Sequence, residues 1–236
     1  MRPRPGVLHD DLVTAPNPSA VQVEEAYDAF VGVLREVPDD ESWNPTGCEG
    51  WAVRDLAYHH LLDAQRALVA LHTPVEEPAD RDAVSYWRDW APDPVGSANH
   101  RRYVRVVASM YSRWDQLRDL HAETCLAVLD AARSVVPERL VRTQGHVLTA
   151  GDLLSTLCVE ATIHHLDLVI DLPGARGPAP GGLTEVRRVL DALVGEPVAT
   201  SWSDERYARV ATGRARPSEA ELHELGSLAG RFPVFS

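Results

Sequence analysis

Residues 149–174 read TAGDLLSTLCVEATIHHLDLVIDLPG, and this stretch carries the signals for one complete helix. Thr149 is a favourable N-terminal cap, and Asp152, three residues later, gives an acidic form of the capping box. An apolar run follows to about residue 171, and Pro173-Gly174 ends it. Four ionisable side chains interrupt this apolar run: Glu160, His164, His165 and Asp167.

Proline and glycine divide the rest of the chain into further long helical segments. We predict helices over residues 19–37, with Ser19 as the cap, over 52–72 and over 98–134. Together with the helix that ends near residue 171, they make four long helices without a clear strand pattern. The predicted fold class is therefore all-α, and the architecture is a four-helix bundle.

The predicted domain organisation follows from composition. Residues 173–182, PGARGPAPGG, have the composition of a linker. We expect the bundle over 1–172 and a small C-terminal extension over 183–236 that packs on the bundle. Within this extension, helices are predicted over 183–195 and 218–231.

Charge and apolar content exclude several classes of function. The net charge of −12 is unsuited to binding a phosphate backbone, so no nucleic-acid partner is expected. No run reaches the roughly 18 apolar residues of a membrane span, and no apolar segment follows the N-terminal charges as in a signal peptide. The sequence therefore predicts a cytoplasmic protein with no membrane partner, either a monomer or a homodimer. Three widely spaced cysteines, Cys48, Cys125 and Cys158, are expected to be reduced.

Glu160 and His164 lie four residues apart, so on a helix their side chains share one face. Leu153 and Leu157 continue this face, which indicates that the pair points into the bundle. A buried carboxylate is costly without a partner, and a metal ion beside it removes that penalty. Alone, the spacing is a weak signal, because a solvated ion pair has the same pattern.

A further ligand would have to come from another helix, and residues 52–72 offer His59 and His60. His60 falls on the apolar stripe of that helix, whereas His59 lies about 100° around it. The spacing leaves both open. Two histidines and one glutamate form a known catalytic zinc set, although the same ligands also hold iron, nickel or cobalt.

Two longer segments resemble a known family. Residues 43–61, WNPTGCEGWAVRDLAYHHL, are similar to the N-terminal signature of the mycothiol-dependent maleylpyruvate isomerase family. That signature includes a histidine eight residues after its tryptophan. Residues 148–168, LTAGDLLSTLCVEATIHHLDL, resemble the second signature. The resemblance covers about residues 19–172 and implies a DinB-like metal-binding four-helix bundle.

The resemblance also implies roles for individual residues. Counting from Trp51, the metal ligands would be His59, Glu160 and His164, and Asp167 would orient a ligand. Among the residues of the tail, Arg214 or Arg216 would approach the site, so Asp167 and Arg214 are the candidate catalytic residues. His60 then stands where the family has an apolar residue. The tail is shorter than the α/β domain of the best-known member, which puts maleylpyruvate itself in doubt as the substrate.

The implied cofactor is a divalent metal, with Zn²⁺ as the expected ion, and the implied cosubstrate is the thiol mycothiol. A metal-held thiolate attacks a small electrophile; the product is either a conjugate, as in a transferase, or a cis–trans isomer. The alternatives are a bundle that binds metal or ligand without turnover, and a biosynthetic enzyme that uses no thiol. Polar residues available to bind the thiol are Asn99, His100, Arg101, Arg102 and Gln144.

Overall fold

The computed structural model describes residues 17–88 and 94–235. The segment on which the signal-peptide prediction rests, residues 1–16, lies outside these ranges. Within them, no helix is both long and apolar enough to cross a membrane.

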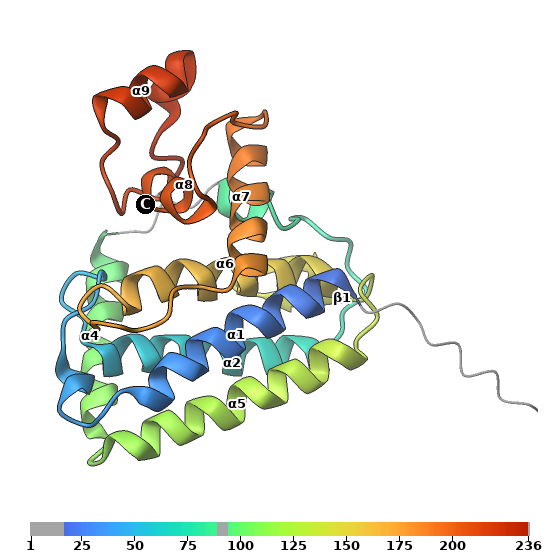
Figure 1. Ribbon diagram of the computed structural model, residues 1–236. Helices are drawn as coiled ribbons and strands as arrows, with labels where there is room; N and C mark the ends of the chain where they lie inside the picture. The colour runs from blue at the N-terminus through green and yellow to red at the C-terminus, as the bar shows by residue number, and fades with distance from the viewer. Residues whose placement is uncertain (1–16, 89–93, 236) are drawn as a thin grey trace, which may run out of the picture.

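Four long helices form the body of the molecule: α1 (Pro18–Glu36), α2 (Val53–His72), α5 (Trp114–Ser134) and α6 (Ala150–Leu168). Figure 1 shows them lying along one another, and the most extensive contacts join α2 to α5 and α1 to α6. The predicted all-α bundle is confirmed. Its core consists of fully buried side chains, such as Phe30, Leu56 and Leu154, each of which contributes about 1.5–3 kcal/mol by leaving water.

Local capping explains where two of these helices begin. The Thr149 side chain accepts a hydrogen bond from the backbone N–H of Asp152, so the predicted start of α6 is confirmed. The predicted start of α1 is wrong by two residues. Asn17, rather than Ser19, provides the cap, and its side chain accepts from the Ser19 N–H. Pro18 takes the first helical position, where its missing N–H costs nothing.

The prediction of one long helix over 98–134 is wrong, because the chain breaks between α4 (Pro94–Met110) and α5. The backbone N–H of Trp114, the first residue of α5, donates to Asp39 Oδ1 at 3.0 Å. The indole Nε1–H of Trp114 donates to the Val37 carbonyl at 2.9 Å. These contacts from the end of α1 anchor the new helix, so α5 lies along the bundle while α4 crosses one end of it (Figure 1).

A short hairpin precedes α6. Strand β1 (Leu140–Thr143) pairs antiparallel with β2 (His146–Thr149). The two residues between them, Gln144 and Gly145, have φ values of 47° and 85°. Positive φ at both central residues matches the twist of a two-residue hairpin. The hairpin thereby holds the Gln144 side chain at its tip.

The C-terminal part contains α7 (Pro180–Val194), α8 (Asp204–Ala211), α9 (Glu219–Leu225) and a 3-10 turn over Gly226–Arg231. Helix α7 begins three residues before the expected 183, and the helix expected over 218–231 divides into α9 and the turn. Helix α7 contacts α6 and α1, and Figure 1 shows it rising from the bundle, with α8 beside it and α9 farther from the bundle. The described residues also include a 3-10 turn over Glu41–Trp43 and the short helix α3 (Ser85–Arg88).

Candidate metal centre

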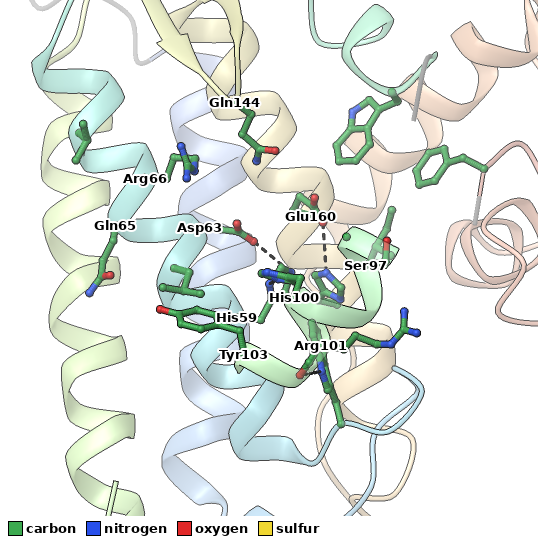
Figure 2. A pocket seen from close by; sticks show the side chains of 18 of the residues that line it. His59, Asp63, Gln65, Arg66, Ser97, His100, Arg101, Tyr103, Gln144 and Glu160 are labelled. Carbon is green, nitrogen blue, oxygen red and sulfur yellow. Dashed lines mark hydrogen bonds and ion pairs between the residues drawn. The ribbon is translucent and has the colours of Figure 1, made fainter. Parts of the chain in front are cut away.

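Helices α2 and α6 face one another with two similar pairs of side chains. On α2, His59 Nε2 lies 3.4 Å from Asp63 Oδ2, four residues on. On α6, Glu160 Oε2 lies 3.4 Å from His164 Nε2, with the same spacing. The rings of His59 and His164 meet edge to face, with centroids 4.9 Å apart. Figure 2 shows Asp63 from α2 and Glu160 from α6 directed into the same pocket.

His164 is oriented by a carboxylate on its own helix. Its Nδ1 lies 3.2 Å from Asp167 Oδ2, and Asp167 is fully buried. An ionised carboxylate only accepts hydrogen bonds, so this contact places a proton on Nδ1, and Nε2 faces Glu160. A carboxylate behind a histidine is the arrangement that holds a metal-binding imidazole in one tautomer.

Arg214, from the segment after α8, fixes that carboxylate. Its Nε donates to Asp167 Oδ1 at 2.8 Å and its Nη2 donates to Oδ2 at 2.7 Å, which makes a bidentate pair. Burial acts to raise the pKa of Asp167, but the hydrogen bonds from His164 and Arg214 lower it below its usual range. Asp167 is therefore ionised. Arg216 stands apart, and its backbone carbonyl accepts from Arg206.

The pair on α2 has a different electrostatic character. Burial, with smaller effects of His164 and His100, lowers the pKa of His59 well below its ordinary value, so this imidazole is neutral. Burial, and then the charge of Glu160, raise the pKa of Asp63 to about 7. Burial likewise raises the pKa of Glu160. Two carboxylates that disfavour each other's charge are what a cation between them would stabilise.

Asp63 was missed by the sequence reasoning. Its position four residues after His59 repeats the Glu160–His164 spacing in reverse order. This repeated spacing could have suggested Asp63 as a site residue, but only with the knowledge that α2 and α6 face each other.

The pKa of His164 is shifted in the opposite direction to that of His59. Burial acts to lower its pKa, but hydrogen bonds with Asp167 and Cys48 and the charge of Glu160 raise it well above its ordinary value. In the metal-free pocket this imidazole is therefore a cation between carboxylates. As a cation, the ring carries a proton on Nε2 as well as on Nδ1. A metal bound at Nε2 would replace the Nε2 proton, as is usual for a histidine ligand.

The three predicted ligands suit a divalent ion by type: two imidazoles and a carboxylate. They meet in pairs through His164 rather than as one compact cluster. Among residues 17–88 and 94–235, two groups have all their donor atoms within 4.8 Å of one another. One is Cys48, His164 and Asp167, and the other is His60, His121 and Cys125.

Cys48 belongs to the site, although the sequence analysis assigned it no role there. Its Sγ–H donates to Asp167 Oδ2 at 3.3 Å, and Sγ lies 3.6 Å from His164 Nδ1. Gly47 permits this approach, because its N–H donates to the Asp167 carbonyl at 2.9 Å. A Cβ at Gly47 would lie 2.6 Å from Asp167 Oδ1, closer than such contacts occur.

A cavity of about 1090 Å³ opens above the two pairs of side chains. Of the polar residues suggested to bind the thiol, His100, Arg101 and Gln144 line it. Arg102 instead lines a neighbouring cavity of about 860 Å³, and Asn99 lines neither. His100 Nε2 lies 3.3 Å from His59 Nδ1, so α4 reaches the centre directly.

The walls of this cavity include basic side chains. Arg66, Arg101, Arg142 and Arg214 line it. Arg142 is paired with Glu77 at 2.7 Å, and Arg214 with Asp167. Within the described part of the chain, the guanidinium groups of Arg66 and Arg101 have no ion-pair partner. Two guanidinium groups that can receive an anion therefore line the cavity, together with the carboxyl groups of Asp63 and Glu160.

The fold and this pocket together define a class: a helical bundle with a histidine–carboxylate pocket between two of its helices. Residues 23–169 match the family model described as the mycothiol maleylpyruvate isomerase N-terminal domain. The match covers more than half of the sequence, and the chain belongs to this family. The expected resemblance is confirmed, and with it the expectation that the chain belongs to an enzyme family.

Solved structures agree with the fold. The chain resembles the crystal structure of the mycothiol-dependent maleylpyruvate isomerase, with 20% identity and a TM-score of 0.51. A histidine-to-alanine variant of that enzyme gives 21% identity and the same TM-score. In both cases the similarity covers 75% of this chain and 68% of the other. No curated protein sequence matches the chain.

Proposed function

We propose that this protein is a metal-dependent enzyme that uses mycothiol to attack a small electrophile. The observation that carries the proposal is the pairing of His59 and Asp63 on α2 with Glu160 and His164 on α6, at the base of a large cavity. Membership in the family supports mycothiol as the thiol. His59, Glu160 and His164 would hold the ion, and Zn²⁺ is the ion we expect.

When bound, the ion favours the thiolate form of the thiol and thereby makes it a nucleophile. The chain's own residues provide the rest. Arg214 holds Asp167, and Asp167 keeps the Nδ1 proton of His164 in place, so His164 presents Nε2 to the pocket. Trp51 packs beside His59, with ring centroids 5.0 Å apart, and limits the movement of that ring.

The cavity supports an anionic electrophile. Arg101 and Arg66 can pair with a carboxylate of the substrate, because neither has an ion-pair partner among the described residues. The thiolate would add to one carbon of an activated double bond. Rotation about the resulting single bond, followed by loss of the same thiolate, gives the geometric isomer. Protonation of the adduct at the neighbouring carbon, by a proton from solvent that replaces the one the thiol released, instead gives the thiol conjugate.

Metal analysis of the purified protein, followed by incubation with mycothiol and a panel of electrophiles that includes maleylpyruvate, tests this proposal. We expect about one divalent ion per chain and either an isomer or a conjugate. Metal without any turnover would overturn the enzymatic part and leave a binding protein.

A matched pair of variants tests the ligand assignment. His59→Ala should lose both metal and turnover. His60→Leu, which changes the neighbouring residue to an apolar one, should keep both. Metal loss from a folded His60→Leu protein, with metal retained in His59→Ala, would reverse the assignment.

A further inference from the structure

The second compact group of donor atoms lies in the core, away from the cavity. His60 is adjacent to His59 but points about 100° around α2, toward α5. His121 and Cys125, four residues apart on one face of α5, meet it there. The exposed fractions of the three residues are 2%, 0% and 1%. The proposed function uses none of them.

The three donor atoms form a triangle. His121 Nε2 lies 2.9 Å from His60 Nδ1, and Cys125 Sγ lies 3.6 Å and 4.0 Å from these two nitrogens. Metal–nitrogen bonds of about 2.0 Å and metal–sulfur bonds of about 2.3 Å place donors roughly 3.4–3.8 Å apart. The triangle therefore fits three-coordinate binding after the two imidazoles separate by about 0.5 Å.

The surroundings are apolar and aromatic. Phe30 stacks on the His60 ring at 4.4 Å, and Tyr27 meets it edge-on at 4.8 Å. Burial lowers the pKa of His121 to about 3, so this ring is a neutral donor. Burial also raises the pKa of Cys125 to about 12, so without a metal the residue is a thiol. Its sulfur then has only weak contacts with the two imidazoles.

In this apolar core, the charge of the metal ion determines which ions the three residues can bind at low cost. A buried net charge without a partner is costly. A divalent ion bound to one thiolate and two neutral imidazoles would leave one positive charge in the core, whereas a monovalent ion would leave none. Soft thiolate ligands select Cu(I), and trigonal sites with two histidines and one cysteine are typical of copper.

We propose that His60, His121 and Cys125 form a second metal site, which binds one monovalent thiophilic cation, Cu(I), in the core between α2 and α5. On binding, the Cys125 S–H bond breaks, its proton leaves to solvent, and Cu–S and two Cu–N bonds form. The ion stays in the Cu(I) state throughout. This site is independent of the cavity and does not rest on the proposed function.

Anaerobic titration of the full chain with Cu(I), against the coloured chelator bicinchoninate, tests the proposal. All proteins carry Cys48→Ser, because Cys48 is the half-buried thiol. The proteins are titrated both as purified and after refolding in the presence of Cu(I), since the cluster is enclosed. We expect one Cu(I) per chain by at least one route, and X-ray absorption should show one sulfur and two nitrogen neighbours.

Cys125→Ser and His121→Ala should each weaken Cu(I) binding at least 100-fold. Cys158→Ser is the matched control, since Cys158 is equally buried in the same core but lies outside the cluster. The proposed site would be overturned if adding Cys125→Ser to the Cys48→Ser protein left its Cu(I) affinity unchanged. It would also be overturned if the Cys48→Ser protein took up no Cu(I) by either route. If Cys125→Ser does not fold, the X-ray absorption spectrum of the Cys48→Ser protein tests the site instead. Copper without one sulfur and two nitrogen neighbours would then overturn the proposal.

Discussion

Arg214 and Asp167 form a bidentate ion pair across 47 residues of sequence, with Asp167 fully buried on α6 and Arg214 in the segment after α8. The same carboxylate contacts His164 and Cys48. The C-terminal segment is thus connected, through one side chain, to a predicted metal ligand. A change in this segment should therefore alter the geometry of the pocket between α2 and α6.

Replacing Arg214 tests this connection. In Arg214→Gln, Asp167 loses its charged partner, and the orientation of His164 loosens. We expect metal affinity to fall about 10- to 100-fold, the usual effect of removing a group that supports a ligand. Arg216→Gln is the control, since only its backbone makes a described hydrogen bond. Competition with a metal chelator measures both variants, and equal affinity would show that the ion pair serves the fold alone.

In the metal-free protein, the contribution of Asp63 to stability should fall as pH rises from about 4 to about 7, opposite to the contribution of buried neutral histidines such as His59 and His121. Asp63 has a pKa near 7 when folded against an ordinary value of 3.8, so over this range the folded state keeps a proton that the unfolded state has released. One pKa unit corresponds to about 1.4 kcal/mol, so the full shift sets an upper limit of about 4 kcal/mol.

Urea unfolding after chelation, at pH 5 and pH 7.5, measures the slope of the free energy of unfolding against pH in the wild type and in Asp63→Asn. The Asp63 contribution to the slope should be absent from Asp63→Asn, because the amide takes up no proton in either the folded or the unfolded state. Saturating metal should also reduce this contribution, since the ion stabilises the charged carboxylate. An unchanged slope in Asp63→Asn would assign the pH dependence to other groups.

Gly47→Ala should distort the loop that carries Cys48. The added Cβ would meet Asp167 Oδ1 at 2.6 Å and Ile170 Cδ1 at 2.9 Å. Such overpacking costs about 1–3 kcal/mol, and metal affinity should fall with it. Gly32→Ala, in α1, is the matched control: its Cβ meets nothing within 4 Å, and alanine favours the helix by about 0.5–1 kcal/mol. Thermal unfolding and metal titration distinguish the two.

Asp39→Ala should destabilise the fold without affecting the pocket. The Asp39 carboxylate caps the first residue of α5 from outside that helix, and loss of a cap costs about 1 kcal/mol. Asp40→Ala is the control, because the Asp40 side chain makes no capping bond. Urea unfolding should separate them, with unchanged metal affinity in both. A loss of affinity in Asp39→Ala would mean that the start of α5 also supports the pocket.

The sequence predicted features whose causes lie close together in the chain. The start of α6 follows from Thr149 and Asp152, three residues apart, and the facing of Glu160 and His164 follows from helical spacing. The break before Trp114 could not be predicted in this way, because the capping group, Asp39, lies 75 residues earlier.

The same limit applies to the pocket. Cys48 approaches Asp167 from 119 residues away, and only the folded chain brings them into contact. The choice between His59 and His60 also needed more than periodicity. The apolar stripe favoured His60, and the structure does bury it, but in a different cluster from the one that His59 joins.

The turn at Gln144 and Gly145 has a practical consequence for changing what the pocket accepts. Gln144 adopts a backbone conformation that glycine or asparagine reaches more easily, while its side chain lies at the rim of the cavity. Exchanging it for asparagine would ease the backbone and shorten the reach into the opening in one step. This hairpin tip is therefore the natural starting point for redesigning selectivity without disturbing the helices beneath.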